Sequence, residues 1–140
     1  MKPIIPLIFV NAKDENKLIG EGTLVDSGAD CTTISEHLAI KLNLPLPPEI
    51  SYTKGIGGKT PVKETQGDII VVRGNEAYKL TIPILVILNG GTELPYPLLG
   101  RYEVFKYFDI TFRERIFKLD FIKKDDNLRR IPIPEKLKGK

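Results

Sequence analysis

Short stretches of apolar residues, either continuous or alternating with polar ones, occur along most of the chain. Stretches of this length that are rich in β-branched and aliphatic residues are typical of strands. They predict strands at Ile4–Val10, Leu18–Val25, Asp68–Arg73 and Tyr78–Leu88. The segment Arg73-Gly74-Asn75-Glu76 between the last two indicates a hairpin turn.

A second hairpin is predicted near the C-terminus, because Phe108–Phe112 and Ile116–Phe121 alternate around residues 113–115. Patterns typical of helices are few. Ser35 can cap a helix over Glu36–Leu42 that ends before Pro45, and Arg101–Tyr107 can form a second short helix. Many short strands with one or two short helices predict a mainly β protein, with a barrel or a sandwich as the expected architecture.

The length of 140 residues suits one domain. From Lys123 onward the chain is charged, contains proline and shows little apolar periodicity. We therefore expect a domain over residues 1–122 and a charged tail over residues 123–140. A solvated tail is the favoured interpretation, and an arm that pairs with a partner subunit is the alternative.

The net charge of +3 is too small to argue for a nucleic-acid partner. A single cysteine, Cys31, excludes an internal disulfide and fits a reducing compartment. With that cysteine and only one histidine, His37, no metal site is expected, and no cofactor. No apolar run has transmembrane length, and Pro3 and Pro6 interrupt the N-terminal run, so a first strand is favoured over a signal peptide. These features predict a cytoplasmic protein with no membrane partner.

Residues 54–60, KGIGGKT, superficially resemble two known loops. A P-loop would need glycine where Thr53 stands, and a helix directly afterwards, but Pro61–Gly67 indicates extended chain. The GxxG loop of a KH domain must join two helices, whereas the residues on both sides of this stretch predict strands. The stretch is therefore predicted to be the glycine-rich tip of a hairpin.

Residues 23–35, TLVDSGADCTTIS, supply the context for this hairpin. An apolar strand leads Asp26 into a turn at Ser27-Gly28, and Ala29-Asp30 follow. The tripeptide alone is weak evidence, because it also arises by chance, but in this context it resembles the catalytic loop of the retropepsins, the retroviral-type aspartic proteases.

Three further features follow in the order of that family. Gly55–Gly58 falls where the family has the tip of its flap, Pro97–Arg101 resembles its apolar-apolar-Gly-Arg segment, and Phe108–Phe121 resembles its closing strands. The resemblance covers roughly residues 4–122. It implies a closed β-barrel of the acid-protease type with one lobe per chain.

Hydrolysis by this family uses two carboxylates around one water, and close carboxylates share a proton. The chain has one Asp-Ser-Gly, and Asp68, Asp109 and Asp120 lack a following Ser-Gly or Thr-Gly. A two-lobed monomeric protease is therefore excluded. An active enzyme would be an obligate homodimer in which Asp26 of each subunit faces the two-fold axis.

The resemblance implies a role for each residue of the loop. Asp26 is the catalytic acid and base, Ser27 hydrogen-bonds across the dimer beneath the two carboxylates, and Gly28 leaves room for the substrate backbone. Ala29 and Asp30 line the cleft.

By the same resemblance, Asp30 pairs with Arg101 of the same subunit, which would tie the catalytic loop to the segment that follows Gly100. The flap would contribute Gly55, Ile56, Gly57 and Gly58, and Tyr96 and Leu98 would form walls of a cleft for extended peptide or protein substrates.

The chain departs from the viral enzymes because little precedes its first strand and much follows Arg101. It resembles the cellular and prokaryotic single-domain members more closely, and Phe108–Phe121 is predicted to supply the dimer sheet. Two other interpretations stay open. One is a non-catalytic dimerisation or peptide-binding module with this fold, and the other is a nucleic-acid-binding β-barrel that uses the basic tail.

Overall fold

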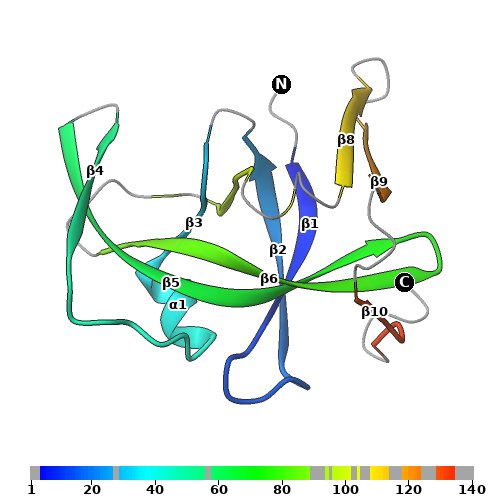
Figure 1. The fold of residues 1–140 in the computed structure, drawn as a ribbon, viewed down its shortest axis with the longest axis horizontal. Coiled ribbons are helices and arrows are strands. Elements are labelled where there is room, and N and C mark those ends of the chain that lie inside the picture. Colours follow the sequence, from blue (N-terminus) through cyan, green and yellow to red (C-terminus); the bar gives the residue numbers. More distant parts are fainter. Residues whose placement is uncertain are drawn as a thin grey trace.

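The computed structural model describes residues 4–26, 29–55, 58–88, 94, 96–101, 104, 108–113, 118–123 and 129–134. In this part of the chain the elements are mostly strands (Figure 1). They are β1 Ile4–Val10, β2 Leu18–Val25, β3 Thr32–Ser35, α1 Glu36–Lys41, β4 Ser51–Gly55, β5 Gly58–Arg73, β6 Glu76–Ile87, β7 Leu98–Leu99, β8 Phe108–Arg113, β9 Lys118–Lys123 and β10 Arg130–Ile131.

Eight strands form one sheet in the order β10-β6-β3-β7-β2-β1-β5-β4, and β5 also pairs with β6. The pairings therefore lead from β5 through β1, β2, β7, β3 and β6 back to β5. Neighbouring strands pair antiparallel except β2 with β7 and β3 with β6, which pair parallel. This arrangement confirms the predicted mainly β class. Strands β8 and β9 form a second, two-stranded sheet at one side of the molecule (Figure 1).

The long hairpin of β5 and β6 crosses the whole molecule (Figure 1). Its turn lies at the predicted position, where Arg73 pairs with Glu76 and Gly74 adopts a positive φ of 61°. Strand β5 has 16 residues and starts at Gly58, ten residues before the predicted Asp68. The sequence indicated extended chain at Pro61–Gly67, and the structure joins this segment to the strand that follows.

The core lies inside the ring of strands. Leu80, Ile82, Ile84 and Val86 alternate with more exposed residues along β6, so one face of this strand points inward. The largest fully buried side chains are Tyr78, Phe9, Leu7, Ile34, Leu42, Ile69, Ile82, Ile84, Leu99, Val62 and Val86.

The helix α1 covers part of this core with Leu38 and Ala39. The Oγ of Ser35 accepts a hydrogen bond from the backbone N–H of Leu38, at 3.2 Å, and so caps the helix as predicted. Asn43 follows the helix with a φ of 53°. The second predicted helix, Arg101–Tyr107, lies mostly outside the described residues.

The expectation of a solvated tail is wrong for residues 129–134. Strand β10 pairs antiparallel with β6, with Ile131 opposite Ala77. Ile131 and Ile133 pack on a second apolar cluster that includes Val10 and Ile70. The reason is that apolar residues two positions apart cover side chains that would otherwise face water. The division of the chain at residue 122 stays a prediction.

In the described residues no helix is long and apolar enough to cross a membrane.

Candidate functional site

Asp26 lies directly after the end of β2 and is half-buried. Strand β2 is held on one side by β1 and on the other by β7. The backbone N–H of Leu24 donates to the carbonyl of Pro97 at 2.9 Å, and that of Asp26 donates to the carbonyl of Leu99 at 3.1 Å. The backbone of Asp26 is therefore held by β7, and the strand that leads to it is held by β1 as well.

The chain turns back immediately after Asp26, as predicted for an Asp-Ser-Gly loop. The N–H of Ala29 donates to the Asp26 carbonyl at 3.1 Å, which closes the turn, while Ser27 and Gly28 lie outside the described residues. The N–H of Arg101 donates to the Ala29 carbonyl at 3.0 Å. The loop is thus attached to the segment 97–101 on both sides of its turn.

A third attachment uses a side chain. The N–H of Gly100 donates to Oγ1 of Thr32 at 3.1 Å, in a buried position. Thr32 itself is 1% exposed and begins β3. No motif in the sequence points to Thr32, because it lies in a β-branched run, Thr32–Ile34, that is typical of an ordinary strand.

Gly100 is required by the close approach of two backbone segments. A Cβ placed on Gly100 would lie 2.5 Å from the carbonyl oxygen of Cys31 and 2.7 Å from the nitrogen of Thr32. It would lie even closer to the carbonyl carbon of Cys31. Since these atoms belong to the backbone, they cannot rotate away. The glycine of the Leu-Leu-Gly-Arg segment therefore lets this segment press directly against the end of the Asp26 loop.

The predicted pairing of Asp30 with Arg101 stays a prediction. Both side chains are exposed. In the described ranges, neither of the ion pairs that Lys79 makes, with Glu15 and with Asp68, involves Arg101. What connects the two segments here is the backbone hydrogen bond from Arg101 to Ala29.

The hairpin of β4 and β5 ends at the glycine-rich tip, where Gly55 pairs with Gly58, and Ile56 and Gly57 lie outside the described residues. Figure 1 shows its tip and the C-terminal end of β2 on the same side of the molecule, at the top of the view. Two large side chains before and in β4, Ile50 and Tyr52, are 50% and 65% exposed, and no motif singles them out. In the sequence these two side chains are marked only by their alternation with the polar Ser51, which indicates a strand with one apolar face.

The two predicted cleft walls lie on the segment that supports the loop. Leu98 is half-buried in β7, between Leu24 and Thr33. Tyr96 lines a hollow of about 220 Å³ together with His37 and Lys41 of the helix. Whether either side chain contacts a substrate stays a prediction.

Cys31 is the residue of this loop whose acidity the surroundings clearly change. Partial burial raises the pKa of its thiol, and the nearby carboxylates of Asp30 and Glu64 raise it further. Among the described residues, no group of three or more histidine, cysteine, aspartate and glutamate side chains could hold a metal ion.

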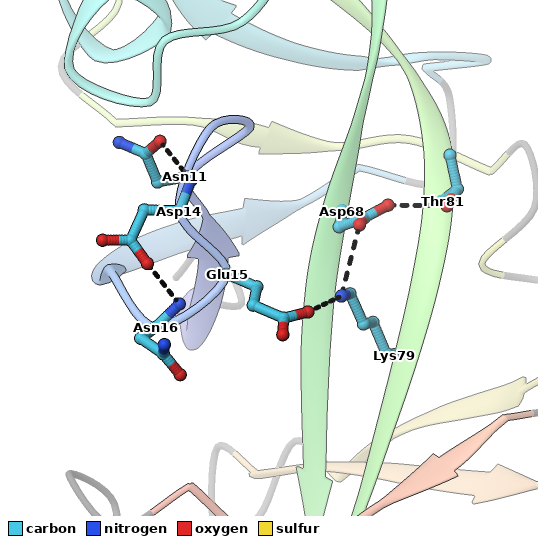
Figure 2. Close-up of polar contacts among 7 residues, drawn as sticks. All are labelled: Asn11, Asp14, Glu15, Asn16, Asp68, Lys79 and Thr81. Atoms are coloured by element: carbon cyan, nitrogen blue, oxygen red, sulfur yellow. Dashed lines mark hydrogen bonds and ion pairs between the residues drawn. The ribbon is translucent and has the colours of Figure 1, made fainter.

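A second polar cluster lies beside the turn between β1 and β2, at the end of β2 opposite to Asp26. Figure 2 shows Lys79 between Glu15, at 3.9 Å, and Asp68, at 3.5 Å. Asp68 also accepts a hydrogen bond from the Thr81 hydroxyl at 2.6 Å. The pair of Lys79 with Glu15 links the turn between β1 and β2 to the long hairpin, and the contacts of Asp68 join the two strands of that hairpin, so we assign the cluster a structural role.

No protein-family model and no curated protein matches this sequence. Solved structures match its fold. The retroviral protease-like domain of Ddi1 from Leishmania major aligns with a TM-score of 0.55 and 12% identity, covering 94% of this chain and 95% of that one. A retropepsin-like aspartic protease from Rickettsia conorii aligns with a TM-score of 0.53 and 20% identity, covering 79% and 76%. The chain therefore has a retropepsin-like fold, as the sequence predicted.

Proposed function

We propose that this protein is an aspartic endopeptidase that acts as a homodimer. The observation that carries the proposal is the placement of Asp26. In a retropepsin-like fold, this aspartate follows β2 in a turn that is hydrogen-bonded on both sides to the segment 97–101. A catalytic carboxylate needs such a fixed position, because small displacements of a reacting group slow a reaction strongly.

The second carboxylate would come from another copy of the chain. One Asp-Ser-Gly occurs in the sequence, and a water activated between two carboxylates needs both. Asp26 of the partner subunit meets this need in a two-fold dimer. Two carboxylates this close share one proton, so one is ionised while the other is protonated.

The reaction then follows from this shared proton. The ionised Asp26 takes a proton from the water, whose oxygen forms a bond to the peptide carbonyl carbon. The protonated Asp26 of the partner subunit gives its proton to the carbonyl oxygen. When the resulting diol collapses, Asp26 gives the proton it took from the water to the leaving nitrogen, a diol hydroxyl gives its proton to Asp26 of the partner subunit, and the carbon–nitrogen bond breaks. The carboxylates are restored and no metal or cofactor is needed.

We propose that the substrate is an extended peptide held between the Asp26 loop and the hairpin of β4 and β5. Ala29, Asp30 and Leu98 would contact it from the loop side, and the glycine-rich tip would close over it as a flap. Closure would exclude water from the carboxylates and strengthen their interactions with the substrate.

The test is cleavage of a mixed peptide library from acid to neutral pH by the wild-type protein and by Asp26→Asn, with molecular mass measured on the same samples. We expect a dimer that cleaves peptides, and an equally dimeric Asp26→Asn variant in which cleavage falls by at least about 10³-fold. Activity that survives in Asp26→Asn, or a monomer at every concentration, would contradict the proposal. A folded dimer that cleaves nothing would instead indicate a peptide-binding module.

A further inference from the structure

Thr32 occupies a position that neither the Asp-Ser-Gly motif nor the Leu-Leu-Gly-Arg segment includes. It is the first residue of β3, where it pairs with Ile84 of the long strand β6. Its side chain is almost fully buried and accepts the hydrogen bond from the Gly100 N–H. Thr32 therefore connects the centre of the core to the segment that holds the Asp26 loop.

The hydrogen bond from Gly100 lies between two others. The N–H of Asp26 donates to Leu99, and the N–H of Arg101 donates to Ala29. Three consecutive residues, 99–101, thus each make one hydrogen bond to the stretch 26–32. The two outer bonds join backbone to backbone, and the middle bond is the one that depends on a side chain.

The Gly100 N–H requires a hydrogen-bond acceptor in a buried position, and few groups other than the Thr32 hydroxyl can meet this requirement. The Gly100 N–H is buried, and an unpaired buried N–H is costly. The backbone packs so closely here that even a single added carbon on Gly100 would collide with it. Oγ1 of Thr32 is the acceptor for this N–H, so removing the hydroxyl takes away its protein partner.

We propose that Thr32 is a positioning residue for catalysis, because its Oγ1 fixes the segment 99–101 and, through the two flanking hydrogen bonds, the place of the Asp26 carboxylate. This inference rests on the proposed function. It adds that the position of the carboxylate depends on one buried hydroxyl that does not touch the substrate.

Two variants separate the hydroxyl from the bulk of the side chain. Thr32→Val keeps the shape and removes the acceptor, whereas Thr32→Ser keeps the acceptor and removes one methyl. We expect Thr32→Val to lower kcat about 10- to 100-fold while KM changes less than about threefold. Thr32→Ser should restore most of kcat, which a purely space-filling role would not allow.

Thr23→Val is the matched control. Thr23 is fully buried in β2, and its hydroxyl donates to the Glu21 carbonyl within the same strand, at 3.0 Å. This variant loses a buried hydroxyl of the same kind without touching the segment 99–101. We expect it to reduce stability while leaving kcat within about threefold of the wild type.

Amide hydrogen exchange tests the proposal independently of activity. In Thr32→Val the amides of Asp26, Ala29, Gly100 and Arg101 should exchange at least about tenfold faster than in the wild type, while those of β1 and β6 should not. Thr32→Ser and Thr23→Val should leave these four amides close to wild type. If the wild-type protein proves inactive, this measurement still decides the positioning role, so the failure of the proposed function and the failure of this inference are distinguishable.

Three results would overturn the inference. The first is wild-type kcat in Thr32→Val, and the second is faster exchange spread evenly over the whole sheet in that variant. If Thr32→Val does not fold, the wild-type protein and Thr32→Ser decide instead. Exchange of the Gly100 amide that is much faster than that of Asp26 and Arg101 would then show that the three bonds do not act together.

Discussion

Gly100 shows how one residue can limit how closely two segments approach. Its missing side chain lets the backbone of residues 99–101 contact that of Cys31 and Thr32. Any other residue must push the two segments apart, and the hydrogen bonds to Asp26 and Ala29 would lengthen with them. The Asp26 loop and the core therefore depend on the same glycine.

We expect Gly100→Ala to lower the free energy of unfolding by about 3 kcal/mol, because its Cβ would collide with backbone that cannot rotate away. Gly20→Ala is the control, since nothing lies within 4 Å of a Cβ at Gly20. That change should be neutral or slightly stabilising. Urea unfolding of both variants at one protein concentration measures the difference. Equal stability of the two would show that the backbone around Gly100 yields readily.

The thiol of Cys31 gives a second residue-scale prediction. Because burial and the carboxylates of Asp30 and Glu64 raise its pKa, less thiolate is present at a given pH. The pH midpoint for alkylation by iodoacetamide should therefore be higher in the folded protein than in urea. Asp30→Asn should lower this midpoint. Glu49→Gln is the control and should not change it, because Glu49 is exposed and is not one of the carboxylates that raise the pKa of the thiol.

The sign of the effect on stability follows from the same shift. The folded protein holds the thiol proton more tightly than the unfolded chain does, so the unfolded chain loses it first as the pH rises. The contribution of the Cys31 thiol to the free energy of unfolding is therefore fully present below the pKa of the thiol in the unfolded chain. It is lost as the pH rises through the pKa of the thiol in the folded protein. Identical alkylation midpoints in folded and unfolded protein would contradict both statements.

At the scale of elements, the short strand β10 closes an edge that the ring of strands leaves open. It pairs with β6 beside the turn of the long hairpin, and Ile131 and Ile133 cover Val10 and Ile70. An uncovered edge of this kind invites pairing with other chains. The described part of the tail, residues 129–134, therefore covers this edge of the sheet.

The combined change of Ile131→Ala and Ile133→Ala should lower the free energy of unfolding by about 2 to 3 kcal/mol, since each isoleucine is partly buried on an apolar cluster. Arg130→Ala, in the same strand, changes an exposed side chain and should cost less than about 0.5 kcal/mol. Denaturant unfolding at a fixed protein concentration tests both. A double variant as stable as the wild type would mean that β10 contributes no stability.

Sequence patterns predicted the elements that carry their own periodicity. The bounds of β1 and β2, the cap at Ser35 and the turn at Gly74 all agree with the structure. Strands β7 and β10 have only two residues each, which is too short for any periodicity to show. They form because a partner strand and an apolar cluster are already in place, and such non-local contacts leave no local pattern.

The candidate site was predictable in its motifs and not in its connections. The Asp-Ser-Gly motif at Asp26 and the glycine-rich tip Gly55–Gly58 were recognisable from their residues and from their order in the chain. The hydrogen bond between Thr32 and Gly100 joins residues that are 68 positions apart, and nothing in either neighbourhood indicates it. The parallel pairing of β2 with β7 is equally invisible in the sequence, although it sets the position of Asp26.

At the scale of the whole molecule, the proposed dimer makes a quantitative prediction. Wild-type protein is mixed with an equal amount of Asp26→Asn and left until the subunits have exchanged. If both carboxylates are needed, mixed dimers are inactive and the activity per wild-type chain should fall by about half. A control mixture with Gly20→Ala should keep full activity. An unchanged activity with Asp26→Asn, in samples shown by mass to contain mixed dimers, would exclude a shared site.

The continuity of β5 has a mechanical consequence. From Val62 onward this strand is paired with β6, and the Pro61 carbonyl accepts a hydrogen bond from the Leu88 N–H at 3.1 Å. Of this strand, only Gly58–Thr60 projects beyond its pairing with β6, over about 10 Å at the usual rise per residue. If this end of the hairpin acts as the proposed flap, a projection this short moves as one piece and opens only a narrow entrance. We therefore expect it to admit a single extended strand and to exclude a folded domain. The protein would then admit only unfolded segments of its substrates, and recognition of their side chains would come after this selection.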